Sequence, residues 1–356
     1  MNPVWSALFF TTMNLTKGDL KIFPDLSFVT KEEFHMNYNC VRVVQEEFLP
    51  QGMKLLDLNY NCIESDGLPV IFPNTIQHLK LDGNRIRDFR DVQQFPPNLK
   101  SLSVYDNPII SLEDIYSILS LETLNIGRTN LETIGLLPQF LTHLLASKCY
   151  RLRMLPNRFP SGLRVAILND CSLRYAGLPG NWGSALEELH LSHNRIERFP
   201  RNLPPTLKLL NLTHNRIREL PEDFNQKFPH LEVCMLAFNK LRSVPVQNRI
   251  RKLAFVDVRN NELTTSLEDQ NRAIERTWAF TISEEQNWME QMHGEGASLI
   301  QKNWRLATMK RRLRTWKRTR DIKDELMCVS MMPERVWQTD VISEEWINSR
   351  KHLQKD

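Results

Sequence analysis

One recurring frame constrains this chain more than any other feature. Leucines and one asparagine follow the pattern LxxLxLxxNxL, which is clearest between residues 207 and 217. There, positions 1, 4, 6, 9 and 11 are Leu207, Leu210, Leu212, Asn215 and Ile217. The ninth position recurs every 20 to 24 residues, at Asn39, Asn61, Asn84, Asn107, Thr129, Cys149, Cys171, Asn194, Asn215, Asn239 and Asn261. Eleven copies at so narrow a spacing indicate one repeating structural unit.

Around positions 4 and 6, apolar residues alternate with polar ones. A period of two is typical of a strand with one buried face. A strand of three or four residues cannot bury that face alone, so each copy must stack on the copies before and after it. We therefore predict an α/β solenoid of about eleven short parallel strands. This repeat overrides the two or three globular domains that 356 residues would otherwise suggest.

The asparagine at position 9 follows directly after its strand. Its amide offers two donors and an acceptor, which can satisfy backbone groups that a bend would leave unpaired inside the solenoid. Thr129, Cys149 and Cys171 interrupt the series. Threonine can partly replace an amide, whereas a thiol is a weak donor. Because Leu152 also stands one position late, we expect the solenoid to be locally irregular there.

The frame resembles that of the leucine-rich repeat family, and the resemblance covers residues 31–265. It implies a horseshoe whose strands line the concave side, and a non-enzymatic protein that binds another protein on that side. Proline-rich lead-ins of the form FPPxL or LPPxL are similar in style to the short repeats of bacterial effectors. Proline removes a backbone donor and fixes an extended conformation, so the convex side should be mostly extended. Residues 111–119 are the exception and could form a short helix.

The N-terminal segment, residues 1–30, shows no repeat and should cap the first unit. Its apolar run at 4–10 is too short to span a bilayer and follows no Lys or Arg, which favours a cap over a signal peptide.

The C-terminal segment, residues 266–356, changes period and contains six of the eight tryptophans. Three capping boxes predict helices at about 267–279, 284–293 and 299–326.

The strongest signal outside the repeat lies in the basic helix expected at 299–326. Its residues fit the spacing of an IQ motif, and it has two apolar faces. The residues concerned are Ile300, Gln301, Trp304, Arg305, Lys310, Leu313 and Trp316. Leu306 stands where the motif prefers Gly. Between residues 300 and 323, ten Lys or Arg oppose one acid, a net charge of +9. Subtracting nine from the +4 of the whole chain leaves −5 for the remainder.

Three roles compete for this helix. It could be a structural cap with Trp304 and Trp316 packed on the last repeat. Its resemblance to IQ motifs implies binding to calmodulin or a related light chain, which grips a basic apolar helix in a flexible groove. Interleaved Trp and Arg could instead contact a nucleic acid or another polyanion. A helix that is apolar on two faces suits a partner that wraps around it better than a flat membrane.

The second candidate surface is the concave face near the C-terminal end of the repeats, set by positions 3, 5, 7 and 8. Exposed apolar residues clustered on a sheet are typical of a protein-binding site. The candidates are His190, His193, Leu209, His214, Val233, Met235, Phe238 and Phe255. His193 and His214 share position 8 in adjacent units and should stack. No further ligand is evident beside them, so a metal site is not predicted.

Chemistry and location are constrained by what the sequence lacks. It has no phosphate-binding glycine loop and no HExxH or GxSxG motif, so we predict neither an enzyme nor a cofactor. Six cysteines show no metal-ligand spacing, although a Cys40–Cys62 bridge is conceivable. Buried thiols suit the reducing cytosol, and we expect a cytoplasmic protein.

The sequence thus predicts a scaffold that binds one protein on its concave face and a second through its basic helix. The alternatives are an effector-like adaptor that recruits substrates to a ubiquitin ligase, and a polyanion-binding protein.

Overall fold

The computed structural model describes residues 12–244, 253, 255–258 and 260–263. The chain divides into two compact units, residues 1–281 and 282–356, and the first contains every described residue. The predicted helices at 267–279, 284–293 and 299–326 therefore lie outside the described residues, as does the apolar run at 4–10.

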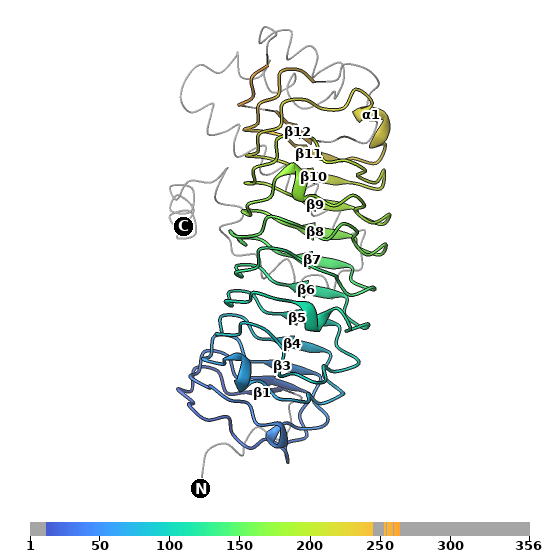
Figure 1. The fold of residues 1–356 in the computed structure, drawn as a ribbon. Helices are drawn as coiled ribbons and strands as arrows, with labels where there is room; N and C mark the ends of the chain where they lie inside the picture. Colours follow the sequence, from blue (N-terminus) through green and yellow to red (C-terminus); the bar gives the residue numbers. More distant parts are fainter. Residues whose placement is uncertain (1–11, 245–252, 254, 259, 264–356) are drawn as a thin grey trace, which may run out of the picture. The chain divides into compact units, whose positions relative to one another are not determined.

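The described part is a single parallel sheet in which the strands follow one another in chain order (Figure 1). Each strand is three residues long, and consecutive strands pair in parallel along the whole sheet. The strands are β1 (Thr12–Asn14), β2 (Glu33–His35), β3 (Leu55–Asp57), β4 (His78–Lys80), β5 (Ser101–Ser103), β6 (Thr123–Asn125), β7 (His143–Leu145), β8 (Val165–Ile167), β9 (Glu188–His190), β10 (Leu209–Asn211), β11 (Val233–Met235) and β12 (Phe255–Asp257). The predicted solenoid of short parallel strands is confirmed.

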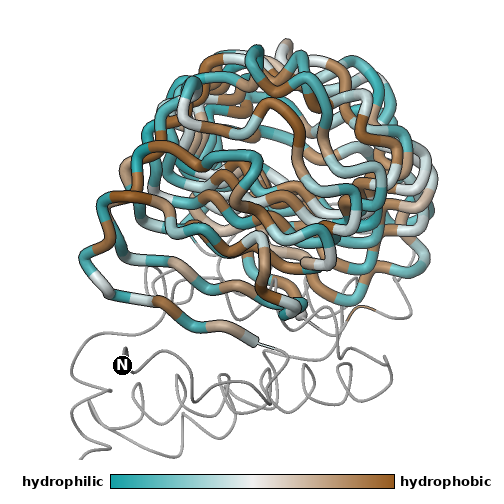
Figure 2. The backbone as a smooth tube through the Cα atoms, turned by 90° about the horizontal axis from the view of Figure 1, so that it is seen from below, coloured by the Kyte–Doolittle hydropathy of each residue, from teal (hydrophilic) through white to brown (hydrophobic). Residues whose placement is uncertain are grey.

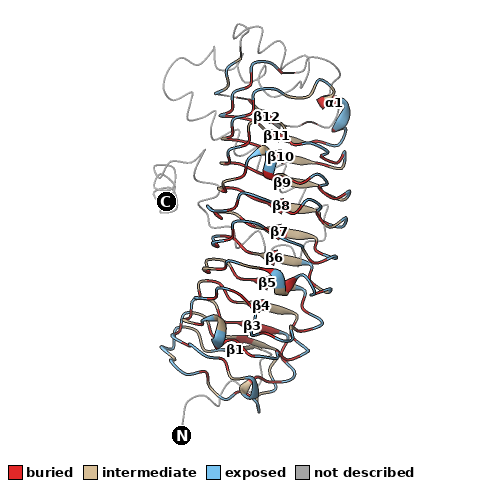
Figure 3. Cartoon of the chain, in the orientation of Figure 1, coloured by how far each residue is buried: buried red, intermediate tan, exposed pale blue. Residues whose placement is uncertain are grey.

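Burial follows the repeat frame. At positions 4 and 6 of the clearest copy, Leu210 and Leu212 are completely buried, and Leu207 and Ile217 at positions 1 and 11 are as well. Figure 2, which looks along the stack of turns, shows hydrophobic and hydrophilic residues alternating along the tube. Buried residues recur at equivalent places in successive turns (Figure 3). Because each turn buries its apolar residues against its neighbours, the core runs the length of the sheet.

The asparagine at position 9 links each turn to the one before it. Asn215 Nδ2 donates to the carbonyl of Leu212 in its own turn, at 3.1 Å, and to that of Leu191 in the preceding turn, at 2.8 Å. Its Oδ1 accepts the backbone N–H of Ile196 at 3.0 Å. The same three bonds recur at Asn61, Asn84, Asn107, Asn194, Asn239 and Asn261. This ladder satisfies buried backbone groups at the bend, as the sequence predicts.

The ladder continues in weaker form where asparagine is missing. Thr129 Oγ1 and Cys149 Sγ both donate to the carbonyl of Ile126, at 2.9 and 3.2 Å, and Cys171 Sγ donates to Ala146. Within the described chain, the backbone N–H of Ile109 has no hydrogen-bond acceptor, because Thr129 does not take the role of the amide oxygen. The middle of the solenoid is therefore held by fewer polar links.

The convex side contains little regular structure, as expected from its prolines. Short 3-10 helices occur at Glu46–Phe48, Ser65–Gly67, Glu113–Ile115 and Tyr175–Gly177, and α1 (Phe224–Lys227) is a single turn. The short helix expected over 111–119 corresponds to the 3-10 turn at Glu113–Ile115.

At its N-terminal side the sheet begins earlier than the expected boundary at residue 31. Strand β1 lies within the segment expected to be a cap, and it pairs with β2 in the register Met13↔Phe34. Gly18 stands at position 9 of this turn, where the frame requires Asn. Asn39 of the next turn still makes the regular ladder bonds to this turn: its Oδ1 accepts the N–H of Leu20 at 3.0 Å and its Nδ2 donates to the carbonyl of Leu15 at 3.0 Å. Its Oδ1 also accepts the N–H of Gly18 at 2.9 Å.

Candidate protein-binding face

The strands position the predicted concave residues in rows. First strand residues form one row, because Glu188 pairs with Leu209, Leu209 with Val233, and Val233 with Phe255. Third strand residues form a parallel row that runs from His190 through Asn211 to Met235. Adjacent parallel strands lie about 4.8 Å apart, so side chains in one row are immediate neighbours. Leu209, Val233 and Met235 are half-buried, with apolar surface still open to solvent.

A column of rings borders these rows. At position 8, three residues after the end of the strand, His193 and His214 stack with ring centroids 4.2 Å apart and an interplanar angle of 16°. The ring of Phe238 continues the stack 4.1 Å from His214, at 8°, and Phe238 is 41% exposed. The stacking predicted for His193 and His214 is confirmed. Stacked rings and apolar strand residues together form a surface suited to a protein partner.

Backbone conformation explains why position 8 forms a column. Its φ angle lies between 53° and 64° in every turn from Lys17 to Asn260. This left-handed conformation is unfavourable for residues with a Cβ atom, yet here it recurs in tyrosine, histidine and phenylalanine. The repeated bend aims successive side chains in the same direction, which lets flat rings lie against each other.

His190 differs chemically from the two stacked histidines. It is the third residue of β9, between Ile167 and Asn211 in the adjacent strands. Burial lowers the pKa of His190 to about 4, because an imidazolium would lose its hydration there. His190 is therefore neutral at physiological pH and adds a polar but uncharged group to the face.

The N-terminal half of the sheet presents a second arrangement that the sequence analysis missed. Tyr38 and Tyr60 occupy position 8 of adjacent turns and stack with centroids 4.7 Å apart at 8°. Lys17 Nζ lies 5.7 Å from the centroid of Tyr38, and Gly83 follows Tyr60 in the column. A Cβ on Gly83 would lie 2.4 Å from the ring of Tyr60, so the glycine makes room for the ring. The sequence could have indicated this pair, because Tyr38 and Tyr60 share frame position 8 in adjacent turns.

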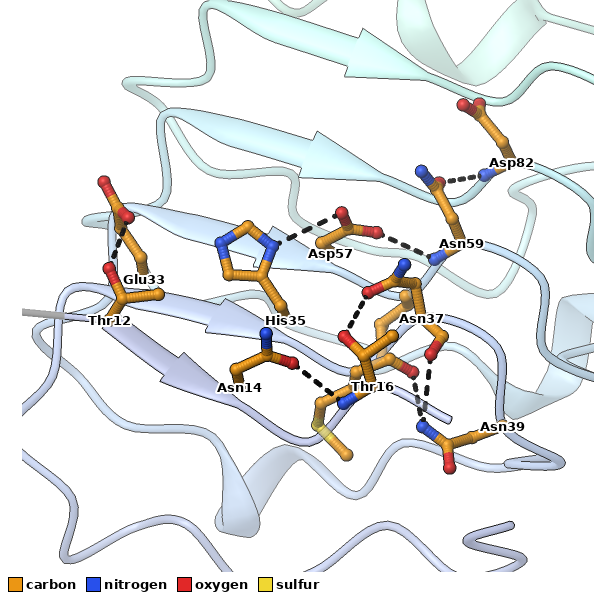
Figure 4. Close-up of polar contacts among 12 residues, drawn as sticks. Thr12, Asn14, Thr16, Glu33, His35, Asn37, Asn39, Asp57, Asn59 and Asp82 are labelled. Carbon is orange, nitrogen blue, oxygen red and sulfur yellow. Dashed lines mark hydrogen bonds and ion pairs between the residues drawn. The ribbon is translucent and has the colours of Figure 1, made fainter. Parts of the chain in front are cut away.

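Polar side chains link successive turns beside these tyrosines (Figure 4). His35 Nδ1 lies 3.5 Å from Asp57 Oδ2, and Asp57 Oδ1 accepts the N–H of Asn59 at 3.1 Å. Asn59 Oδ1 then accepts the N–H of Asp82 at 2.6 Å. This face is therefore polar and contains acids, in contrast to the apolar face of β9–β12.

Two open hollows on the described surface lie away from the predicted concave residues. One is lined by residues that include Lys100, Leu119 and Phe140, and the other by residues that include Arg128 and Tyr150. Across the described ranges, no group of three His, Cys, Asp or Glu could hold a metal ion. Among these same residues, no helix has the length and apolarity that crossing a membrane requires.

The predicted residues of the basic helix cannot be placed, since they lie outside the described residues. These are Ile300, Gln301, Trp304, Arg305, Lys310, Leu313 and Trp316. The structure also shows Cys40 and Cys62 as free thiols, although they occupy the same position of adjacent turns.

The strand order, the asparagine ladder and the recurring frame define a leucine-rich repeat fold. A family model described as Leucine Rich Repeat matches residues 185–205 and 206–226. These residues contain β9 and β10, the two strands at the start of the apolar concave face.

Among curated proteins, the chain is similar to Podocan-like protein 1 of Mus musculus, with 27% identity over 274 residues that cover 66% of this chain and 49% of that protein. It is also similar to Osteomodulin of Rattus norvegicus, with 32% identity over 185 residues, 49% of this chain and 44% of that protein. The chain spans about half the length of these relatives or less.

Solved structures share the fold. The leucine-rich repeat domain of APL1B superposes with a TM-score of 0.60 at 18% identity and covers 76% of this chain and 88% of that one. YopM, a leucine-rich effector protein of Yersinia pestis, gives a TM-score of 0.52 at 20% identity, over 71% of this chain and 78% of that one. Leucine-rich repeat proteins of this kind are generally protein-binding scaffolds and typically non-enzymatic.

Proposed function

We propose that this protein is a scaffold that binds a protein partner on the concave face of β9–β12. The observations that carry the proposal are the half-exposed apolar row of Leu209 and Val233, and the stacked rings of His214 and Phe238, which come three residues after the ends of the same two strands. Apolar and aromatic side chains clustered on one exposed face are characteristic of the centres of protein interfaces. Half-exposed apolar side chains follow one another over adjacent strands of this face, so a macromolecule is the occupant it fits best.

Site-specific photo-crosslinking tests this proposal. A benzophenone side chain placed at Met235 should capture a protein from the source cells, and the same group at Leu136 should not. Leu136 is 73% exposed and lies outside the strands, so it controls for accessibility. With the captured protein purified, Leu209→Asp should weaken binding at least tenfold, because a carboxylate would be desolvated in the interface. Leu136→Asp should change affinity less than twofold, and equal effects of the two substitutions would refute the site.

We further propose that residues 299–326 bind calmodulin or a related light chain. The support is the IQ-like spacing of Ile300, Gln301 and Arg305, together with the net charge of +9 between residues 300 and 323. Titration of the full chain with calmodulin, with and without calcium, should shift tryptophan emission. Ile300→Glu and Arg305→Glu should each weaken this binding at least tenfold. No spectral change at micromolar calmodulin would end the proposal.

Other roles of the basic helix predict different outcomes. A polyanion site predicts retention on heparin that falls steeply with salt, because bound cations are released. An adaptor of a ubiquitin-ligase pathway predicts that a ligase subunit is captured through the C-terminal segment. A cytoplasmic location is part of the same proposal, and the five free thiols of the described residues are compatible with it.

A further inference from the structure

The three turns that contain β9, β10 and β11 share cations at two frame positions. Positions 10 and 12 follow the ladder asparagine, and in these turns they hold five Lys or Arg and one Glu, a net charge of +4. The five cations, which we call the basic strip, are Arg195, Arg216, Arg218, Lys240 and Arg242. Because the chain outside residues 300–323 has a net charge of −5, the strip is a local concentration of positive charge.

The side chains of the basic strip are open to solvent on one side of the turns. In the turn of β10, Asn215 and Ile217 are buried. Arg216 and Arg218 alternate with them and are exposed, as are the other three cations of the strip. Alternating burial is the behaviour of an extended segment, so positions 10 and 12 project from the same side of the turn.

Backbone hydrogen bonds hold these positions of successive turns side by side. The N–H of Arg216 donates at 2.9 Å to the carbonyl of Ile196, the residue after Arg195, and the equivalent bond recurs in the next turn. The N–H of Arg242 donates to the carbonyl of Arg218 at 3.2 Å. Stacked turns lie about 5 Å apart, so the cations form short rows of like charge that repel each other.

The fold does not require these cations. Other residue types occupy position 10 in other turns, at Cys40, Cys62, Pro108, Asn130 and Ser172. Among the described residues, Arg195, Arg216 and Lys240 form no ion pair. Their charges are therefore available to a ligand.

Three acids lie near the basic strip and leave it positive. Glu197 Oε2 accepts the N–H of Tyr175 in the preceding turn at 3.4 Å. Glu219 at position 13 and Glu262 at position 10 of the β12 turn are exposed. With all three acids counted against the five cations, the net charge is still +2. An anionic ligand is the kind that this surface attracts.

The neighbouring apolar face indicates which anionic ligand fits. Leu209 and Val233 are half-buried at position 3 of the β10 and β11 turns. The stacked rings of His214 and Phe238 follow at position 8, two residues before the cations of position 10. A protein segment with apolar and acidic side chains matches this order, whereas a nucleic acid has an anionic backbone but few aliphatic groups to pack on Leu209 and Val233.

We propose that the basic strip binds an acidic segment of the protein partner, an inference that rests on the proposed function of the β9–β12 face. Carboxylates of the segment accept paired N–H bonds from the guanidinium groups of Arg195 and Arg216. Apolar side chains of the same segment pack on Leu209 and Val233. Charge complementarity of this kind speeds association and rejects basic competitors.

Fluorescence anisotropy of the full chain with a labelled dodecapeptide of alternating leucine and glutamate tests the proposal. All variants carry Lys310→Glu, Arg311→Glu and Arg312→Glu, so that the basic C-terminal segment does not dominate peptide binding. In this background, Arg216→Glu should weaken binding about five- to tenfold, because a repelling carboxylate replaces a pairing cation. Its control is Arg87→Glu, the same charge change at an exposed residue in the turn of β4, which should change affinity less than about twofold. Equal effects of the two substitutions would overturn the proposal.

Further probes separate the alternatives. The same peptide with glutamine in place of glutamate should bind at least about fivefold more weakly, because it lacks the charge. A labelled oligothymidylate that binds more tightly than the peptide, and loses affinity with Arg216→Glu, would assign the strip to a nucleic acid and overturn the proposal. Leu209→Asp reports on the apolar face: if it leaves the captured partner bound, the β9–β12 face fails, whereas the result for Arg216→Glu with the peptide decides the strip.

Discussion

Replacing Asn215 by alanine removes one rung of the asparagine ladder. The side chain makes three short bonds: to the carbonyl of Leu191 at 2.8 Å, to that of Leu212 at 3.1 Å, and from the N–H of Ile196 at 3.0 Å. Asn215 is 7% exposed, so water cannot readily replace these partners. The loss should therefore destabilise the fold.

The three backbone groups that bond to Asn215 are affected differently by the substitution. The Leu191 carbonyl keeps a bond from Asn194 at 3.0 Å, and the Leu212 carbonyl keeps one from Asn239 at 2.8 Å. The N–H of Ile196, which is itself completely buried, loses its acceptor. Two lost bonds of about 1 kcal/mol each and one unsatisfied donor of about 1–3 kcal/mol give a destabilisation of about 3–5 kcal/mol.

Urea unfolding followed by circular dichroism and by tryptophan fluorescence measures this change. Coincident transitions are required, because repeat proteins can unfold in stages. Cys149→Ala removes the thiol at position 9 of another turn. The lost sulfur hydrogen bonds should lower the free energy of unfolding by about 1 kcal/mol, and the lost packing of the buried sulfur should lower it further. Asn130→Ala, at an exposed site, should stay within about 0.5 kcal/mol of the wild type. A loss below about 1 kcal/mol for Asn215→Ala would refute the structural role of the ladder.

Three further substitutions test local features of the solenoid. Thr129→Asn should add about 1–2 kcal/mol of stability by restoring the missing acceptor, and a loss would contradict that interpretation. Gly83→Ala should destabilise the fold by about 1–3 kcal/mol, because the residue has a φ of 64° and the new Cβ would collide with the ring of Tyr60. Gly52→Ala is the control and should not destabilise it, since a Cβ there would meet no atom within 4 Å. Burial raises the pKa of Asp82 from 3.8 to about 6, so its ionisation lowers stability as pH rises from about 4 to 6. Asp82→Asn should therefore add about 1–3 kcal/mol at pH 7.5 and little at pH 4; an equal gain at both would contradict the assignment.

The sequence predicted the strands because each copy of the frame repeats the same physical requirement. Leu210 and Leu212 had to be buried, and Asn215 had to satisfy the bend, in every arrangement that stacks the turns. Strand β1 was not predicted, because Gly18 stands where the asparagine that marks a turn would be, although Asn39 of the next turn bonds to this turn as the ladder requires.

The candidate sites were only partly predictable. Frame position 8 placed His193 and His214 together, and the same position holds Tyr38 and Tyr60. Their stacking depends on the left-handed backbone of this position, which the hydrophobic pattern does not specify. The burial of the Asp82 carboxylate depends on how neighbouring turns pack around it, which composition and spacing do not specify.

Oxidative footprinting of the chain with its captured partner tests the proposed binding face most directly. Hydroxyl radicals modify Met235 on the strands and Met154, which is 54% exposed outside them. The two methionines have the same chemistry and differ in their place on the molecule. We expect the partner to reduce oxidation of Met235 several-fold and to leave Met154 unchanged. Protection of Met154 with no change at Met235 would contradict the assignment of the binding face to β9–β12.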